Sequence, residues 1–327
     1  MSSGGKRIFV TGGTGRTGRH LISELLRRGY RVRAVTSREP SVQSGVEWLK
    51  MDWHEDISFD PRLEGCAAVL HLGAELSNIP KMYRANVEAT EALAGSAERV
   101  GVRFLCYTST ISVYGSPRRR VVTEDAPVVT TERDTRSEYL AEDFFRAYAR
   151  TKLLGEKRIE VITRQIDCVI VRPTVIVDLG DILDVGNWSL LRKCLLASRH
   201  SHQIYVKDVV YMILSFMERS LARPVGQSGV EVYNLSNDDV GYNTHAYFLR
   251  KAYKATGERR FWCPPCMPGA ADMFRLMFKY RSRQLRYPPG MLRYSPEKLY
   301  RTGYRHPFGI LEAHKRAIGD IAKRRAD

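Results

Sequence analysis

Long apolar runs are absent from this chain of 327 residues. No stretch approaches the roughly 18 uncharged apolar residues that a membrane-spanning helix needs, so we expect no integral membrane segment. The first residues, Met1–Arg7, also lack the apolar core of a secretory signal peptide and lead directly into a β-rich run. We therefore expect a cytoplasmic protein.

Metal-ligating patterns are scarce as well. Of the six cysteines, only Cys263 and Cys266 are closely spaced, as Cys-Pro-Pro-Cys, and no second pair accompanies them. We interpret this motif as a proline-stiffened loop rather than a redox or metal site. The sequence predicts no metal, because the spacing of metal ligands is also missing among the candidate histidines His71, His200, His202 and His245.

Acidic residues are few compared with Lys and Arg, 36 against 52, which gives a formal net charge of +16. Such a charge suggests nucleic acid as a partner, because Lys and Arg release counterions from phosphate backbones. The basic residues are dispersed, however, and the densest run, Lys279 to Arg301, is interleaved with Tyr and Pro without a recognised nucleic-acid module. An anionic small substrate, a carrier protein or an acidic membrane surface explains the charge equally well. We expect no nucleic-acid partner.

The first half of the chain alternates short β-rich runs with helical patterns, which is typical of a parallel sheet with crossover helices. In the segment 16–28, apolar residues recur at helical spacing and Gly29 supplies a stop. We predict an α/β fold with a doubly wound parallel sheet of the Rossmann type. Strands are expected at Arg7–Thr11, Arg31–Thr36, Val46–Met51, Ala67–Leu72, Arg103–Thr108 and Asp167–Arg172, and further long helices at Met82–Val100 and Ala141–Arg164.

Beyond Arg172 the helical patterns become shorter. We expect one further strand at Glu231–Leu235 and a last helix at Phe308–Arg325. Residues 1–172 should form the dinucleotide-binding core and residues 173–327 a smaller, mainly substrate-binding lobe, with a segment at about 203–237 returning to the core. An apolar face at Met273, Phe274, Met277 and Phe278 could contact a membrane or a lipophilic substrate, but packing against the main domain is favoured.

A glycine-rich loop, Thr11-Gly12-Gly13-Thr14-Gly15-Arg16-Thr17-Gly18, joins the first strand to the first helix. Gly12 permits a tight turn, Gly15 lets backbone N–H groups approach a pyrophosphate, and Gly18 lets the helix pack closely on the sheet. A glycine-rich turn without a ligand is the alternative. The residues that we expect to bind a dinucleotide here are Gly12, Gly15, Arg16, Thr17 and Gly18.

The end of the second strand indicates which dinucleotide is bound. An acidic residue there would bind the ribose 2′-hydroxyl of NAD, but the chain continues with Ser37-Arg38. Arg38, with Ser37 beside it, could hold the 2′-phosphate of NADP. We favour NADP over NAD, while the alternative interpretation is an ordinary exposed loop arginine.

Tyr148 and Lys152 lie four residues apart in a predicted helix and therefore on one face of it. A phenol with a reference pKa of about 10 is a poor base, and a nearby ammonium group would lower that pKa. Tyr148 could then exchange a proton with a substrate hydroxyl while a hydride moves to or from a nicotinamide. A hydroxyl-rich loop, Tyr107 to Gly115, ends the fifth strand and could orient the substrate oxygen.

Taken together, these motifs resemble the extended short-chain dehydrogenase/reductases, also called the NAD-dependent epimerase/dehydratase group, over nearly the whole chain. The glycine loop resembles their TGxxGxxG pattern, and Val113-Tyr114-Gly115, Arg172-Pro173 and Tyr205 to Val209 also match. The resemblance implies catalytic roles for Thr110, Tyr148 and Lys152, with Ser109 and Ser112 as supporting residues. It also implies cofactor contacts by Asp52, Gly73, Ala74, Asn86, Tyr148, Lys152 and Pro173.

The chain departs from the sugar-nucleotide enzymes of that group in several places. Ile111-Ser112 replaces the Asp-Glu of the dehydratases, and Val175 replaces a substrate-binding Asn. The segment 180–205 is short. The segment 124–148 is long, and could shape the substrate mouth or be a solvated loop, with Arg133, Arg136, Tyr139 and Phe144–Phe145 within it.

These features predict an NAD(P)-dependent oxidoreductase that interconverts a secondary alcohol and a ketone, with an NADPH-linked reductase favoured. A nucleotide-sugar epimerase that retains NAD is the first alternative, and a non-catalytic dinucleotide-binding regulator is the second. The partners that we expect are a small-molecule substrate, for which an anion is an option, and a second copy of the chain in a homodimer.

Overall fold

The structure is a computed structural model that describes residues 5–39, 44–115, 117, 119–129, 143–224, 228–265 and 292–326. The chain forms two compact units. The first unit comprises Met1–Ser116, Pro127–Arg172 and Val209–Tyr233, and the second comprises Pro117–Ala126, Pro173–Asp208 and Asn234–Asp327.

A seven-stranded sheet forms the centre of the first unit, in the order β10-β7-β5-β4-β1-β2-β3. Its neighbouring pairs from β3 to β7 are all parallel. The strand order reverses between β1 and β4, and this switch point is where open α/β sheets bind ligands. The predicted doubly wound α/β fold is confirmed. The strands are β1 (Arg7–Thr11), β2 (Arg31–Thr36), β3 (Val46–Lys50), β4 (Cys66–His71), β5 (Phe104–Thr108), β7 (Asp167–Pro173) and β10 (Gly229–Leu235).

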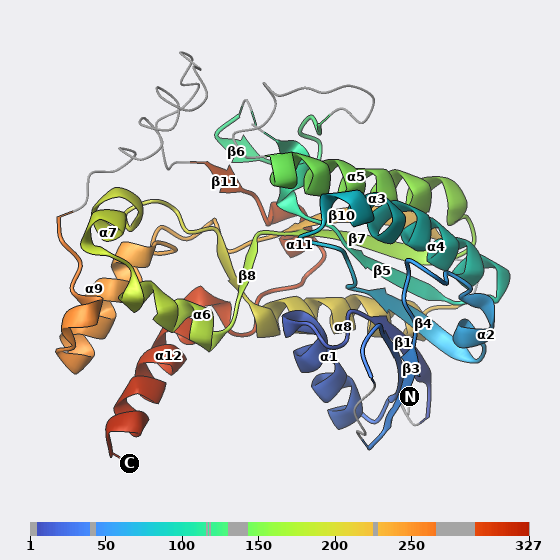
Figure 1. The fold of residues 1–327 in the computed structure, drawn as a ribbon, viewed down its shortest axis with the longest axis horizontal. Coiled ribbons are helices and arrows are strands. Elements are labelled where there is room, and N and C mark those ends of the chain that lie inside the picture. Colours follow the sequence, from blue (N-terminus) through green and yellow to red (C-terminus); the bar gives the residue numbers. More distant parts are fainter. Residues whose placement is uncertain are drawn as a thin grey trace. The chain divides into compact units, whose positions relative to one another are not determined.

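Helices cover both faces of this sheet (Figure 1). Helices α3 (Ile79–Tyr83), α4 (Ala89–Arg99) and α5 (Asp143–Ile162) lie on one face, whereas α1 (Arg16–Arg27) and α8 (Val206–Ala222) lie on the other. The short α2 (Asp60–Leu63) precedes β4. Apolar residues of α1 alternate at helical spacing and are buried against the sheet: Leu21, Ile22 and Leu25.

One predicted helix differs in detail from the observed one. The expected helix Met82–Val100 starts earlier, at Ile79, and contains a π-helical turn at Arg84–Glu88. Asn78 explains the earlier start, because its side chain accepts a hydrogen bond from the backbone N–H of Lys81 and so caps the helix. The π turn holds Asn86, one of the predicted site residues.

The second unit combines short strands with helices around a core of its own. Strand β8 (Val175–Val177) pairs with β9 (Gln203–Tyr205), and β6 (Val121–Val122) pairs with β11 (Arg293–Tyr294). The sequence did not predict these strands, because two or three residues carry no readable alternation. The helices of this unit are α6 (Leu179–Asp184), α7 (Leu190–Leu196), α9 (His245–Thr256), α11 (Glu297–Arg301) and α12 (Gly309–Ala326).

Helix α12 closely matches the expected helix Phe308–Arg325. Its start is fixed by Asp208, whose two carboxylate oxygens accept the N–H groups of Phe308 and Gly309, both at 2.9 Å. None of the helices in the part of the chain that the structure describes is long and apolar enough to cross a membrane.

Several predictions fall outside the described residues. These concern Cys266, the apolar face at 273–278, and Arg133, Arg136 and Tyr139 of the long segment 124–148. Phe144 and Phe145 of that segment are described and lie in the first turn of α5, with their rings 5.0 Å apart.

Candidate active site

The predicted dinucleotide loop lies between β1 and α1. Gly12 has φ of +68°, which favours glycine, and a Cβ there would come 2.7 Å from the backbone nitrogen of Gly73. The N–H of Gly15 donates to the carbonyl oxygen of Gly12 over 3.0 Å and closes the turn. A Cβ on Gly18 would overlap that same oxygen. Glycine is therefore sterically required at Gly12 and Gly18.

The start of α1 offers backbone N–H groups to a ligand. Gly15 is the N-cap, and no side chain caps the first turn, which contains Arg16 and Thr17. The first N–H groups of a helix lack partners within the helix and carry partial positive charge. The arrangement therefore suits an anion such as a pyrophosphate.

Gly73 and Ala74 directly follow β4, the neighbour of β1 across the switch point. The backbone N–H of Gly73 donates to Oγ1 of Thr11 over 3.0 Å. A Cβ on Gly73 would overlap the indole ring of Trp53, so this position too is sterically restricted to glycine. The structure thus brings Gly73, which follows β4, against the glycine loop.

A chain of buried hydrogen bonds links this loop to α5. Nδ1 of His71 lies 2.7 Å from Oγ1 of Thr11, and its Nε2 lies 3.0 Å from Oγ1 of Thr90. The Thr90 hydroxyl donates to the backbone oxygen of Asn86 over 2.9 Å, and Nδ2 of Asn86 donates to Oγ1 of Thr151 over 3.1 Å. Burial, together with the positive charge of Lys152, holds the pKa of His71 well below 6.5. The imidazole is therefore neutral at physiological pH.

Asn86 was predicted as a cofactor contact, and in the structure its side chain holds the segment after β4 in position. Its Oδ1 accepts the N–H of Glu75 over 2.8 Å, and its Nδ2 also donates to the carbonyl oxygen of Glu75 over 3.0 Å. The residue is buried. It therefore fixes the segment after β4 relative to α5, while direct cofactor binding stays a prediction.

The ends of β2 and β3 lie side by side at the same edge of the sheet. The N–H of Met51 donates to the carbonyl oxygen of Thr36 over 2.8 Å. Ser37 and Arg38 follow β2 and are exposed, whereas Asp52 follows β3 and accepts the N–H of His54 over 2.9 Å. All three predicted residues are thus placed near one another. No acidic side chain occupies the tip of β2.

Tyr148 and Lys152 lie one turn apart on α5, as predicted. The side chain of Lys152 is buried, with Nζ 4.0 Å from the centre of the Tyr107 ring. Tyr107 in turn lies beside His71, with ring centres 5.3 Å apart. A Cβ on Gly155 would overlap the Tyr107 hydroxyl, so glycine lets α5 approach β5 closely. These contacts place Lys152 beside the end of β4.

The pKa of Tyr148 in the structure differs from the value that the sequence suggested. The sequence suggested that Lys152 lowers the pKa of Tyr148, whereas burial raises the pKa of Tyr148 from 10.0 to about 12. Burial also lowers the pKa of Lys152 from 10.5 to about 7, although the carboxylate of Glu156 opposes this shift. Near neutral pH, therefore, Lys152 is only partly charged and Tyr148 is protonated. In this state Tyr148 is a proton donor.

Thr110 stands at the end of the extended segment that follows β5. Its Oγ1 accepts the N–H of Ser112 over 3.1 Å and so caps the 3₁₀ turn Ile111–Tyr114. The same hydroxyl donates to Oγ of Ser112 over 3.2 Å. Thr110 is 9% exposed, at the limit between buried and accessible. Ser112 thus orients the Thr110 hydroxyl.

A buried ion pair that sequence reasoning missed supports the same loop. Arg172 at the end of β7 donates to both carboxylate oxygens of Glu156 on α5, at 3.1 and 2.6 Å, and to the hydroxyl of Tyr114 at 2.9 Å. The Ser109 hydroxyl donates to the same carboxylate. Arg172-Pro173 and Ser109 were named from the resemblance, whereas Glu156 was not. Its position four residues after Lys152, on the same helix face, could have pointed to it.

Residues 8–177, more than half of the chain, match the model of the NAD dependent epimerase/dehydratase family. The chain belongs to this family. A sterol-4-alpha-carboxylate 3-dehydrogenase, decarboxylating, from Dictyostelium discoideum is 29% identical over 134 residues, 37% of this chain and 41% of that protein. A UDP-glucose 4-epimerase from the same organism is 27% identical over 175 residues, 46% of this chain and 45% of that protein. The chain thus spans less than half the length of these two curated relatives.

Solved structures extend the likeness to the whole fold. A short-chain dehydrogenase/reductase superfamily protein from Agrobacterium tumefaciens, with bound NAD, has a TM-score of 0.71 and 24% identity, and the match covers 98% of both chains. The predicted resemblance to the extended short-chain dehydrogenase/reductases is therefore confirmed for this family member.

Among the residues predicted to contact the cofactor, Pro173 is the one that belongs to the second unit. It ends β7, whereas the remaining predicted site residues belong to the first unit. Its role as a cofactor contact stays a prediction.

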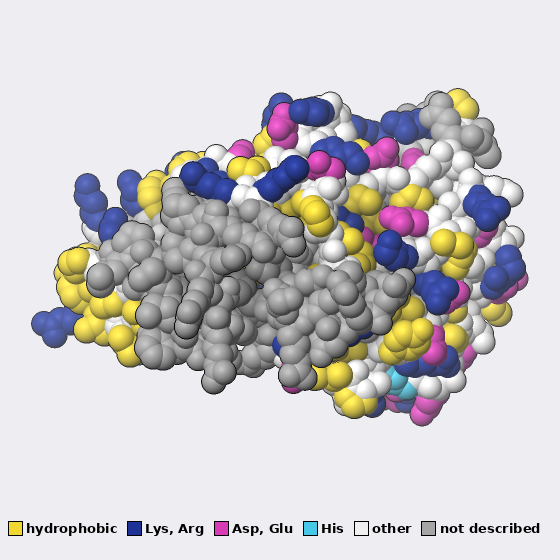
Figure 2. Space-filling view, turned by 90° about the horizontal axis from the view of Figure 1, so that it is seen from above, with side chains coloured by type: hydrophobic (Ala, Val, Ile, Leu, Met, Phe, Trp, Pro, Cys, Tyr) yellow, Lys and Arg dark blue, Asp and Glu magenta, His cyan; other side chains and the backbone are white. Residues whose placement is uncertain are grey.

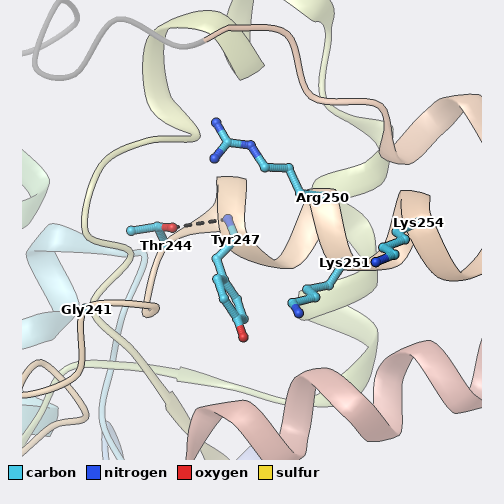
Figure 3. Close-up of a pocket in the computed structure, with 6 residues that line it drawn as sticks. All are labelled: Gly241, Thr244, Tyr247, Arg250, Lys251 and Lys254. Atoms are coloured by element: carbon cyan, nitrogen blue, oxygen red, sulfur yellow. Dashed lines mark hydrogen bonds between the residues drawn. The ribbon is translucent and has the colours of Figure 1, made fainter.

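A separate pocket of about 400 Å³ lies against α9 in the second unit. Figure 3 shows the basic side chains Arg250, Lys251 and Lys254 on this helix, with the Tyr247 ring beside Lys251. The Lys251 Nζ is 5.6 Å from the centre of that ring. No predicted site residue lines this pocket. Its charge is of the kind that attracts anions.

The described side chains on the face drawn in Figure 2 are of mixed charge. Where side chains are coloured in Figure 2, Lys and Arg are scattered among acidic and hydrophobic residues rather than gathered in one field. Several of them form exposed ion pairs, such as Arg99 with Asp60 and Arg301 with Glu297.

Proposed function

We propose that this chain is an NAD(P)-dependent oxidoreductase that interconverts a secondary alcohol and a ketone, working as an NADPH-linked reductase. The observation that carries the proposal is the position of Tyr148 and Lys152. They lie on the α5 face next to the end of β4, and hydrogen bonds link this region to the glycine loop at the switch point. Family membership and the name of the dehydrogenase relative support the same reaction class.

The residues present fit a dinucleotide. The uncapped start of α1 suits the pyrophosphate, and the glycines at Gly12, Gly18 and Gly73 stand where side chains would overlap the backbone or Trp53. Ser37 and Arg38 are exposed at the end of β2, where a 2′-phosphate would lie. When bound, the nicotinamide supplies or accepts the hydride.

Each catalytic residue has a distinct task in the reductive direction. Tyr148 gives its phenolic proton to the substrate oxygen, because its raised pKa keeps it protonated at neutral pH. Thr110 orients this oxygen by a hydrogen bond, for which its single hydroxyl proton turns from Oγ of Ser112 to the substrate. Lys152 binds the nicotinamide ribose, and it lowers the energy of the phenolate that forms when Tyr148 has lost its proton.

A nucleotide-sugar epimerase is the second candidate, because a UDP-glucose 4-epimerase is among the relatives and aligns over 46% of this chain. Ile111-Ser112 and Val175 depart from the sugar-nucleotide pattern and favour the reductase. The intact Thr110, Tyr148 and Lys152 set disfavours a non-catalytic dinucleotide-binding regulator.

The test begins with a panel of ketones and UDP-sugars supplied with NADPH or NADH. Net NADPH consumption supports the reductase, whereas product formation without net change in the cofactor supports the epimerase. Tyr148→Phe removes the hydroxyl and keeps the ring, so turnover should fall by roughly 10²–10⁴-fold while the dissociation constant of the cofactor stays nearly unchanged. Lys152→Met should impair both turnover and cofactor binding.

The matched control is Tyr83→Phe, which removes a hydroxyl from a tyrosine on α3 that is 48% exposed. This variant should keep full turnover. If Tyr148→Phe is as active as Tyr83→Phe, the proposed mechanism is wrong.

A further inference from the structure

Three side chains with metal-ligating atoms meet in the second unit. His200 and His202 lie just before and next to β9, and Asp238 follows β10. Nδ1 of His202 is 2.5 Å from Oδ2 of Asp238, and Nδ1 of His200 is 3.3 Å from its Oδ1. One ligand atom from each residue lies within 4.8 Å of the other two. Sequence spacing missed this group, because 36 residues separate His202 from Asp238.

The group contains buried polar atoms that lack hydrogen bonds. The side chain of His200 is 4% exposed, and neither of its ring nitrogens makes a well-oriented hydrogen bond among the described residues, although Nδ1 lies 3.3 Å from Oδ1 of Asp238. The side chain of Asp238 is fully buried, and its Oδ1 also lacks such a hydrogen bond there. An unsatisfied buried polar group costs about 1–3 kcal/mol. A group of this kind in a native fold calls for an explanation, and an ion is one of the few available.

The backbone around the group is held in an unusual and rigid arrangement. His202 has φ of +51° and is the only residue other than glycine with positive φ in the described part of the chain. Such conformations persist only where the surrounding structure enforces them, and they cluster at functional sites. Asn243 provides the enforcement, since its Nδ2 donates to the carbonyl oxygens of Gln203 and Asn237 at 2.9 and 3.1 Å. The segments that carry the two histidines and Asp238 are therefore tied together.

We propose that His200, His202 and Asp238 bind one divalent transition-metal ion of the zinc type. Imidazole nitrogen and carboxylate oxygen are both ligands of Zn²⁺, with bonds of about 2.0–2.2 Å. Two ligands on a tetrahedral ion of that size lie about 3.4 Å apart. The His200–Asp238 separation of 3.3 Å already matches this spacing. The ion replaces the hydrogen bond between His202 and Asp238. Nδ1 of His202 must then be unprotonated, because an imidazole nitrogen binds a metal through its lone pair.

Such an ion would give a partner to Nδ1 of His200 and to Oδ1 of Asp238, and it would stabilise the second unit. The ion would join the segment before β9, which carries the two histidines, to the segment after β10, which carries Asp238. Strand β11 would be linked as well, because the N–H of Tyr294 donates to Oδ2 of Asp238 over 3.0 Å. Three protein ligands leave a fourth tetrahedral position for water or another small ligand. The site is independent of Tyr148 and Lys152, so its test does not depend on the proposed reductase activity.

The test uses the full chain without an affinity tag, in a Cys263→Ser/Cys266→Ser background that removes the closely spaced thiols. After dialysis against EDTA, the protein is titrated with Zn²⁺ in competition with a chromophoric chelator, and with Co²⁺ while the visible spectrum is recorded. We expect one equivalent of metal per chain, an increase of Tm on adding Zn²⁺, and an intense visible band from four-coordinate Co²⁺.

Two ligand variants decide the assignment. His202→Asn suits the left-handed backbone, because Asn tolerates positive φ, and Asp238→Asn keeps the side-chain shape. Each should weaken Zn²⁺ binding at least about 10-fold. Substituting a residue that only hydrogen-bonds to a metal ligand already weakens binding by about 10-fold or more, and loss of a ligand itself should cost no less. The control is His54→Asn, a partly buried histidine of the first unit, which should bind metal like the parent.

Less than half an equivalent of metal bound to the parent would overturn the proposal. Binding by His202→Asn as tight as that of the His54→Asn control would also overturn it. If Asp238→Asn fails to fold, His202→Asn decides the question alone.

Discussion

At the scale of single residues, cofactor choice depends on the end of β2. Arg38 is exposed there and no acidic side chain occupies the tip, so a 2′-phosphate would find a planar guanidinium. We predict that Arg38→Ala weakens NADPH binding about 10-fold or more and leaves NADH binding nearly unchanged, because a hydrogen bond to a charged group contributes about 1.5–3 kcal/mol. Arg31→Ala, at the opposite end of β2, is the charge-matched control. Isothermal titration with both cofactors measures the difference. Equal losses for NADPH and NADH in Arg38→Ala would contradict the assignment.

At the scale of elements, the pair Arg172–Glu156 joins β7, α5 and the loop after β5. The two side chains are 7% and 1% exposed, and they form a bidentate ion pair. Glu156→Gln keeps the shape but leaves the Arg172 charge buried without compensation, so we expect the free energy of unfolding to fall by about 3–5 kcal/mol. Urea denaturation of both proteins measures this change. Glu91→Gln, which removes the partner of exposed Arg158, should cost less than about 1 kcal/mol. A similar loss of unfolding free energy in both variants would show that the buried pair stabilises the fold no more than an exposed pair does.

The same scale shows what the sequence could and could not predict. Most ends of α1 and of the sheet strands were predicted to within one or two residues, because these elements have clear periodicity and glycine stops. The 17-residue helix α8 and the 12-residue helix α9 were not predicted. The strands β6, β8, β9 and β11 were missed, since two or three residues contain no periodic signal. Motifs identified the glycine loop and the Tyr148–Lys152 pair, but not Glu156 or the His200–His202–Asp238 group. Spacing does not show that Glu156 is buried and paired with Arg172, or that His200 and His202 meet Asp238, because these contacts join distant segments.

At the scale of the whole molecule, the net charge of +16 needs an explanation that fits its distribution. Lys and Arg are scattered over the coloured surface in Figure 2, and some are paired with acids. Three of them gather at the α9 pocket. A dispersed charge attracts any polyanion weakly at low salt, because it releases few counterions at any one place, whereas a true nucleic-acid site concentrates many phosphate contacts.

We therefore predict that mixed-sequence duplex DNA and RNA bind weakly at low salt, and that binding vanishes at physiological salt without sequence preference. Fluorescence anisotropy across a salt series measures this. Two triple variants with the same loss of charge separate the sources: Arg250→Ala/Lys251→Ala/Lys254→Ala empties the α9 pocket of cations, and Arg31→Ala/Lys157→Ala/Arg164→Ala removes scattered exposed ones. If the attraction is diffuse, both triples weaken low-salt binding to the same extent, since each removes three positive charges. Tight binding at physiological salt that only the α9 triple abolishes would instead make that pocket a nucleic-acid site and refute the prediction.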